Sequence, residues 1–202
     1  MARSGMAALI TELRSYIEAG TADYNIVGSA GTTYYWSDDQ MQDVLDVHRH
    51  DIVFEQLSMY PVQVAGGSLS YLDYRSGYGY YEQTTGGTSI FYIQDSTGLI
   101  AGTSAAGTYT PDYRRGQVQF ATNTAGTVYY LTGRSYDLNA AAADIWRRKA
   151  AHVAPTSFDF STDNHSISRS QVYSHALEMA KYFEGRSAGA IVSVPIFRSD
   201  VP

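Results

Sequence analysis

Residues 136–155 read YDLNAAAADIWRRKAAHVAP, and their apolar positions recur with the spacing of an amphipathic helix. Asp137 is placed to cap the first turn, and Pro155 closes the last. The alanine run 140–143 lets another backbone approach closely. The stretch therefore predicts a helix that packs tightly against other elements. Its apolar side consists of Leu138, Ala141, Ala142, Ile145 and Trp146.

Three further segments have the same helical periodicity. The first covers residues 6–19, and the second begins at Ser37, with Gln40 in the position of a capping box. The last runs from 168 to 185, and residues 20–36 are expected to form a loop. The apolar stripes of these helices are Met6, Leu9, Ile10, Leu13 and Ile17; Met41, Val44, Leu45 and His48; and Val172, Ala176, Met179, Ala180 and Phe183.

Residues 52–131 consist of short β-branched and aromatic runs separated by glycines, a pattern typical of antiparallel strands and hairpins. The clearest hairpin is TYTPDYRRGQVQF, with a turn from Pro111 to Gly116 and with Val118 and Phe120 on one side. The predicted strands are 52–64, 69–74, 89–94, 106–110, 117–121 and 127–131.

We therefore predict an α+β protein with a discontinuous four-helix core, a large antiparallel β insertion and an extended C-terminal arm. The length of 202 residues fits one domain with an insertion, and 44% hydrophobic residues suffice for a core. The predicted parts are 1–51, the first part of the helical core; 52–131, the β-rich insertion; 132–186, the second part of the helical core; and 187–202, the arm.

Polar side chains are densest in FDFSTDNHSISRSQ, residues 158–171. Asp159, Ser161 and Asp163 resemble part of a calcium loop, but the glycine and the glutamate that complete such a loop are missing. No nucleophile elbow surrounds the serines, which argues against a Ser/His/Asp triad with His165. We interpret the stretch as a link between two helices. Phe158 and Phe160 anchor it to the core, and its free backbone amides are satisfied by the polar side chains of Asp159, Asp163 and Ser168.

Other candidates for metal or cofactor binding are incomplete. His48 and His50 form an H-x-H pair without a third ligand, so a solvated or capping role is favoured over a metal site. Arg147, Arg148 and Lys149 complement a helix C-terminus, and an interface role remains equally open. The glycine pairs match no phosphate-binding loop. We predict no catalytic residues, no metal, no cofactor and no enzymatic activity.

Charge and composition exclude several classes of protein. The net charge of −6 argues against a protein that binds nucleic acid through its phosphates, and residues 36–59 alone carry six acids against Arg49. The chain has no cysteine, which rules out disulfides and thiolate metal sites. No apolar run is long enough to span a bilayer and no signal peptide is evident, so a soluble protein made in the cytoplasm is expected.

Interaction surfaces are predicted at the tyrosine-rich tract, at the two arginines of the basic cluster and on the C-terminal arm. The tyrosines that alternate with glycine and serine after residue 70 offer rigid area and a hydroxyl, which suits a protein interface or a sugar. The arm has apolar residues without helical period. The predicted interface residues are Tyr71, Tyr74, Tyr78, Tyr80, Tyr81, Arg147, Arg148, Ile191, Val192, Val194, Ile196 and Phe197.

Three tracts of the chain resemble the head–tail connector proteins, or adaptors, of long-tailed bacteriophages. WSDDQMQDVLDVHRHDI is similar to the second helix of that family, and MYPVQVAGGSLSYLDYRSGYGYYE to strands that some members insert. The strongest likeness is in residues 129–183, with an AAADxW helix, an FDFS link and a last helix that begins with RSQ.

The resemblance implies a structural virion protein at the head–tail interface. It implies a ring, usually of twelve copies, that contacts the portal on one side and a tail-side stopper or tail terminator on the other. Double-stranded DNA passes through such a ring transiently, no membrane is involved, and the family has no catalytic residues. The alternative that the tyrosines leave open is a binding module, either a virion decoration or a carbohydrate-binding protein.

Overall fold

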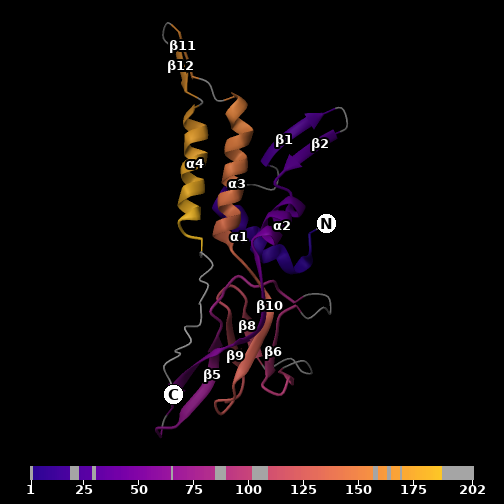
Figure 1. The fold of residues 1–202 in the computed structure, drawn as a ribbon, viewed down its shortest axis with the longest axis vertical. Coiled ribbons are helices and arrows are strands. Elements are labelled where there is room, and N and C mark those ends of the chain that lie inside the picture. The colour runs from indigo at the N-terminus through magenta and orange to yellow at the C-terminus, as the bar shows by residue number, and fades with distance from the viewer. Residues whose placement is uncertain are drawn as a thin grey trace, which may run out of the picture.

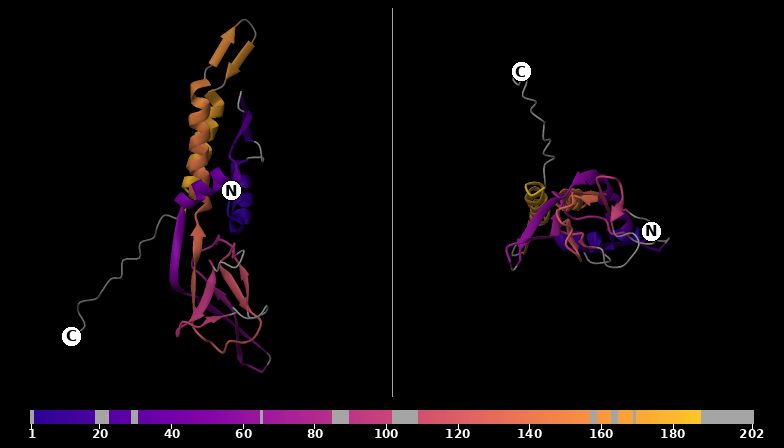
Figure 2. Two further views of the ribbon diagram at one scale, coloured as in Figure 1. Left: turned by 90° about the vertical axis from the view of Figure 1, so that its right-hand side faces the viewer. Right: turned by 90° about the horizontal axis from the view of Figure 1, so that it is seen from below.

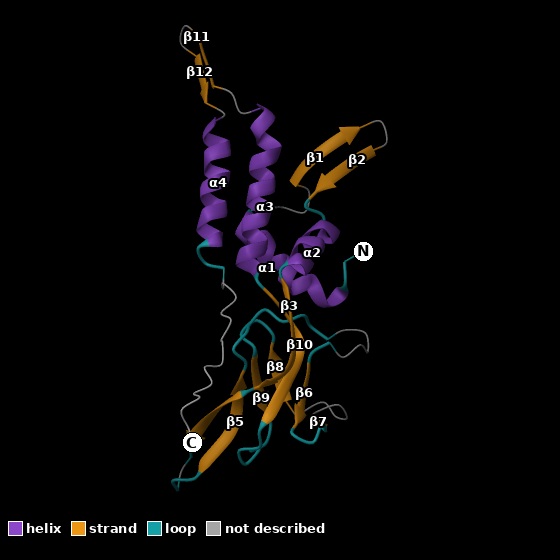
Figure 3. Cartoon of the chain, viewed as in Figure 1, coloured by secondary structure: helices purple, strands orange, loops and turns teal. Residues whose placement is uncertain are grey.

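The protein is α+β, as predicted, with helices at one end and a β body at the other (Figures 1 and 3). The computed structural model describes residues 2–18, 23–28, 31–64, 66–84, 90–101, 109–156, 159–162, 165–168 and 170–187. Within these ranges there are four α-helices, two four-stranded antiparallel sheets and two separate two-stranded hairpins. The molecule is elongated along the direction from the helices to the β body (Figure 2).

The helices begin close to where the sequence places them. They are α1 (Ala7–Ile17), after one 3-10 turn (Ser4–Met6), α2 (Asp38–Val47), α3 (Leu138–Val153), followed by a 3-10 turn (Ala154–Thr156), and α4 (Ser170–Glu184). The predicted capping box of α2 is present, since Gln40 N donates to Ser37 Oγ and Ser37 N donates to Gln40 Oε1. Ala140 N donates to Asp137 Oδ1 at the start of α3. Among the described helices, none has the length and apolar character needed to cross a membrane.

Buried side chains from all four helices form one cluster, which we call the helical core. The predicted apolar positions of α1 and α3 are all buried, and so are three of the four predicted for α2. In α4 the prediction is wrong for Val172, which is 54% exposed. It lies in the first turn, at the end of α4 farthest from α1 and α2 (Figure 1), so fewer elements cover it.

Two sheets build the β body. One has the order β3-β10-β6-β7 and the other the order β4-β5-β9-β8, with antiparallel pairing throughout. The strands of the first sheet are β3 (Arg49–Gln56), β10 (Tyr129–Tyr136), β6 (Tyr92–Asp95) and β7 (Ile100–Ala101). Those of the second are β4 (Ser58–Gln63), β5 (Leu69–Arg75), β9 (Gln117–Phe120) and β8 (Tyr109–Asp112).

A second cluster of buried side chains lies between the strands, and we call it the β core. The predicted β8–β9 hairpin is confirmed, with Val118 and Phe120 both buried in this core. The predicted strand 52–64 is broken at Leu57, which is 1% exposed, so that β3 and β4 join different sheets. The β core consists of Ile52, Leu57, Tyr74, Tyr81, Phe91, Ile93, Val118, Phe120 and Leu131.

The structure corrects the prediction at two hairpins. The expected loop 20–36 contains β1 (Asp23–Gly28) paired with β2 (Gly31–Tyr35). The link between α3 and α4 contains β11 (Asp159–Thr162) paired with β12 (His165–Ser168). In both segments glycine or polar residues outnumber large apolar ones, which hides the strand pattern. The side chains of these hairpins, and the arm beyond Ser187, lie outside the described residues.

The expected boundaries at residues 51/52 and 131/132 fall inside strands. β3 begins at Arg49, directly after α2, and β10 continues to Tyr136, whose side chain is buried in the helical core. Asp137 then caps α3, and its N–H donates to His48 O at 3.0 Å. The paired strands β3 and β10 therefore lead from the β body directly into α2 and α3.

The close contact of α3 with its neighbours gives the first prediction. Ala142 is fully buried at 0% exposure, so Ala142→Leu forces extra volume into a packed core and should cost about 1–3 kcal/mol of unfolding free energy. Ala151→Leu, at an exposed position of the same helix, is the matched control and should change stability little. Denaturant unfolding measures both variants, and equal stability of the two would contradict the packing described.

Candidate functional site

A buried carboxylate joins the helical core to the β body. Glu82 is 0% exposed and lies in the segment 76–84, which crosses between the two. Its Oε1 accepts from Arg3 Nε at 2.9 Å, and its Oε2 accepts from Tyr136 OH at 2.8 Å. Arg134 Nη1 is 3.6 Å from Oε2. A carboxylate removed from water is tolerated only with such charged and hydrogen-bonding partners.

Arg3 extends this network to α2. Its two terminal nitrogens donate to the two oxygens of Asp46 at 2.9 and 2.7 Å, a bidentate pair, and Nη2 also donates to Tyr136 OH at 3.1 Å. The hydrogen bonds from Arg3 lower the pKa of Asp46, and the carboxylates raise the pKa of Arg3. Burial, followed by the hydrogen bond to Glu82, raises the pKa of the Tyr136 phenol. The Tyr136 phenol therefore stays neutral at neutral pH and lies between the charged groups.

The N-terminal segment also contacts the crossing segment through its backbone. Gln83 N donates to Gly5 O at 3.2 Å, and Glu82 N donates to Arg134 O at 2.9 Å. A Cβ at Gly5 would lie 2.4 Å from Gln83 O, so only glycine permits this approach. One sequence signal could have indicated the network: Glu82 is the single charged residue between Arg75 and Asp95.

A second polar group fixes the start of the crossing segment. Glu55 Oε1 accepts from Gly77 N at 2.7 Å, and its Oε2 accepts from Ser76 Oγ at 2.6 Å. Tyr81 OH donates to the same oxygen at 3.3 Å, and burial raises the pKa of that phenol. On the helical side, the hydroxyls of Tyr16 and Tyr80 are 3.1 Å apart.

These contacts change the interpretation of the tyrosine cluster. Tyr74 and Tyr81 are 0% and 1% exposed within the β core, so the prediction that they form an intermolecular interface is wrong. Tyr80 is partly buried against the helical core, and Tyr71 is half-buried. Only Tyr78, at 49% exposure, is an open surface tyrosine among the five. The tyrosines that alternate with glycine lie in a crossing segment, where Tyr80 packs against the helical core and Tyr81 lies in the β core. Fewer tyrosines are therefore available for a binding surface.

The basic cluster on α3 is divided among three partners. Arg147 pairs with Glu184 of α4, and Arg148 pairs with Asp144 one turn earlier at 2.8 Å. Lys149 is 5% exposed, and its Nζ donates to the carbonyl of Ile17 at 2.7 Å. Both arginine side chains are about half exposed, so their interface role stays a prediction, whereas Lys149 fastens α3 to α1.

The two histidines of the H-x-H pair lie in different elements. His48 is the C-cap of α2, with Nε2 4.0 Å from Asp144 Oδ2, and His50 lies in β3. Within the described ranges, no group of three or more His, Asp or Glu side chains could hold a metal ion. The side chains of Asp159, Asp163 and His165 lie outside those ranges, so the link stays a prediction.

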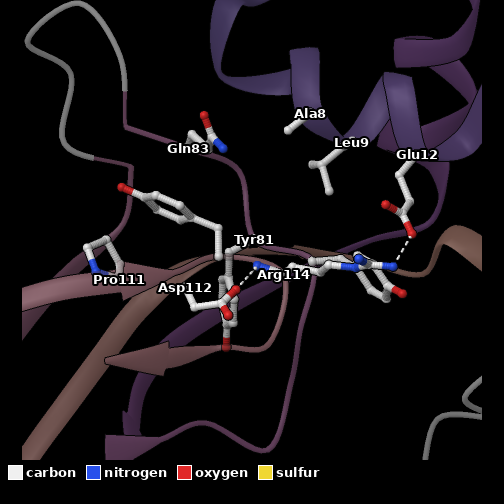
Figure 4. A pocket seen from close by; sticks show the side chains of 10 residues that line it. Ala8, Leu9, Glu12, Tyr81, Gln83, Pro111, Asp112 and Arg114 are labelled. Atoms are coloured by element: carbon white, nitrogen blue, oxygen red, sulfur yellow. Dashed lines mark hydrogen bonds and ion pairs between the residues drawn. The ribbon is translucent and has the colours of Figure 1, made fainter. Parts of the chain in front are cut away.

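A cavity of about 350 Å³ lies between α1 and the β8–β9 turn (Figure 4). Its two carboxylates already have partners: Glu12 Oε1 accepts from Arg114 Nη2 at 2.6 Å, and Asp112 Oδ1 accepts from the N–H groups of Arg114 and Arg115. The other lining residues are Ala8, Leu9, Tyr80, Tyr81, Gln83, Pro111 and Tyr113. Both carboxylates of this cavity therefore take part in hydrogen bonds that hold the chain together.

Several apolar side chains of β3, β4 and β5, and of the turn between β4 and β5, are exposed. The β4–β5 ribbon, residues 58–75, exposes Tyr60, Val62, Val64 and Leu69 at 44–60%. The Phe54 patch consists of Val53 at 76% exposure and Phe54 at 45%, with Phe54 stacked on Tyr130 at a ring-centroid distance of 4.2 Å. Uncovered apolar surface of this kind marks interaction sites.

The Phe54 patch lies at a β-bulge. Between the pairs Leu131–Glu55 and Gly133–Ile52 the register shifts, so that Val53 and Phe54 both oppose Thr132. Phe54 has φ 59°, a left-handed conformation that is costly for a bulky residue, and its N–H donates to Thr132 Oγ1 at 3.2 Å. Bulges at sheet edges redirect side chains, and here the result is an exposed aromatic stack.

Comparison of the chain with protein-family models, with curated proteins and with solved structures finds no match in any of the three.

The buried network gives the second prediction. Glu82→Gln removes the charge that Arg3 and Arg134 neutralise and should lower the unfolding free energy by about 3 kcal/mol, the cost of removing one partner of a buried ion pair. Glu178→Gln, at an exposed position of α4, is the control and should be within about 0.5 kcal/mol of the parent. Denaturant unfolding at pH 7 checks both, and a neutral Glu82→Gln would show that the network contributes little.

A third prediction concerns pH. The pKa of Asp46 is lower in the folded than in the unfolded chain, so its contribution to stability is present above the unfolded value of about 3.9 and is lost as pH falls through the folded value. At pH 7 Asp46→Asn should be about 1.5 kcal/mol less stable than the parent protein. This difference should shrink steadily below about pH 4, and a difference that stays constant down to pH 2 would contradict the assignment.

Proposed function

We propose that the chain is the subunit of a ring that joins the portal to the tail of a long-tailed bacteriophage and lets DNA pass. The observation that carries the proposal is the resemblance of residues 129–183 to head–tail connector proteins. The AAADxW motif falls on α3 and the RSQ motif at the start of α4, two helices that lie side by side (Figure 1). The small and aromatic residues of the first motif are buried, so they are packing residues without chemistry of their own.

The proposal includes a four-helix core that is interrupted by the β insertion and followed by an arm that reaches a neighbouring subunit, the portal or the tail-side protein. Uncovered apolar side chains on β3, β4 and β5 support it, because a ring subunit buries much of its surface against neighbours. The ring occupies the head–tail interface of the virion.

Charge also favours a conduit over a nucleic-acid-binding protein. The chain carries −6, and α2 exposes Asp38, Asp39 and Asp43 on one side. Like charge between the subunit and the DNA phosphates discourages adhesion during passage. Arg14 pairs with Asp38 at 2.7 Å, so part of this charge is compensated.

The alternative function, a tyrosine-based binding module for sugars or for decoration of a virion, has less support. Its two central tyrosines, Tyr74 and Tyr81, lie in the β core. Glycan binding by an isolated monomer would favour it over the ring.

Native mass spectrometry, with and without a portal protein, tests the proposed function. A closed oligomer, formed alone or with the portal, is the expected result. A chain that stays monomeric in both conditions contradicts the proposal.

The fourth prediction concerns the arm. A deletion of residues 188–202 keeps Ser187, whose hydroxyl donates to Asp137 Oδ2 at 2.7 Å beside the start of α3. The truncated protein should keep its helix content by circular dichroism but should no longer join the connector assembly. An unfolded truncation would place the arm in the core of its own chain, and normal assembly would show that the arm is dispensable.

A further inference from the structure

We infer that the β4–β5 ribbon is the contact between neighbouring copies at the level of the β body, and that it packs on the Phe54 patch of the next copy. The inference rests on the proposed ring and adds to it the pair of surfaces that meet. It starts from the composition of the ribbon: residues 58–72, SMYPVQVAGGSLSYL, contain no charged residue.

The ribbon extends beyond the β core. β5 pairs with β9 only at Asp73, Tyr74 and Arg75, whereas the pairing of β4 with β5 continues to Gln63 and Leu69. Past Asp73 the ribbon therefore has two strands only, apart from hydrogen bonds of Tyr71 with Asn123 and Thr124. A two-stranded ribbon is marginally stable in water unless one face packs on something.

One face of the ribbon is apolar and uncovered. Val62 and Val64 lie two residues apart, so their side chains share one face of the ribbon. Both valines are exposed, at 60% and 44%. Past the pair of Tyr60 with Asp73 the register shifts, and beyond this bulge the ribbon presents apolar side chains without a cover.

The free edge of the ribbon is poorly suited to the addition of another strand. β4 is an edge strand, and its Pro61 has no N–H to donate. The register also shifts between Tyr60 and Val62. Both features protect an edge against further strand pairing. A partner therefore binds through the apolar face of the ribbon.

The Phe54 patch of a second copy is a matching partner. It is apolar and aromatic, and both Val53 and Val62 are exposed within one chain, at 76% and 60%. The two apolar surfaces of one copy therefore do not cover each other. A contact between unlike surfaces of successive copies gives a ring when the rotation between copies closes and an open filament when it does not, whereas a contact between like surfaces stops at a dimer.

The size of the surfaces also fits a ring. Four half-exposed side chains provide on the order of a few hundred Å², and a specific interface needs about 800 Å² from each partner. The ribbon alone is therefore too small for a stable isolated dimer. As one contact among several between ring neighbours, it is of suitable size.

Cross-linking tests which surfaces meet, because the chain has no cysteine of its own. The double variant Val53→Cys/Val62→Cys is treated, as an assembled oligomer, with a short homobifunctional maleimide. A ladder of covalent species up to the full ring is expected on denaturing gels, with no ladder from either single variant. Dimers from Val62→Cys alone would show that ribbons contact each other and would overturn the inference.

A charge substitution provides the second arm of the test. Val62→Glu/Val64→Glu should abolish the oligomer and leave a folded monomer, because two carboxylates would be buried in the contact. The control Leu99→Glu changes a residue that is 70% exposed between β6 and β7, and it should assemble normally. If the Val62→Glu/Val64→Glu variant still forms a ring, the inference is overturned and the proposed function stands. The same holds if the double cysteine variant forms a ring that gives no covalent ladder. A parent protein that forms no oligomer, with or without portal, overturns both.

Discussion

The carboxylate of Glu82 holds the two halves of this protein together. It is shielded from water, and its partners come from the N-terminal segment, from β10 and, through Arg3, from α2. The free-energy cost of burying this carboxylate without partners would be prohibitive. The two halves can therefore associate in this arrangement only when all of these partner groups contact it. The glycine at position 5 is part of the same constraint, because a larger residue would hold the N-terminal segment away from Gln83.

This junction explains why the outer surfaces are free for partners. The polar groups that could have served a site, namely Glu55, Glu82, Tyr81 and Tyr136, are consumed in attaching the β body to the helices. The carboxylates of the cavity beside α1 are used in the same way. The exposed apolar side chains of the β4–β5 ribbon and the Phe54 patch are not used in this way. Polar groups used inside the molecule and apolar side chains exposed on the strands support the proposed role as an assembly subunit.

The sequence predicted the helices well because their signals are local. Caps at Ser37 and Asp137, and apolar stripes three and four residues apart, are contained within each helix. The network at Glu82 could not be predicted in this way, since Arg3 and Tyr136 are 133 residues apart and no local pattern connects them. The break at Leu57 was missed for a related reason: β3 and β4 form one continuous strand pattern, and only the pairing with β10 and β5 separates them. Tyr74 and Tyr81 were misassigned because spacing by glycine and serine resembles an exposed strand, whereas both side chains are buried in the β core.

The most direct test of the account is whether the two cores unfold together. Both tryptophans, Trp36 and Trp146, belong to the helical core, so their fluorescence reports on that core alone. Amide hydrogen exchange of peptides from β5 and β9, measured over the same guanidinium series, reports on the β core. If the buried network couples the halves, the two midpoints coincide in a single cooperative transition. A β core that loses protection at a clearly lower concentration than the one at which fluorescence changes would contradict the coupling.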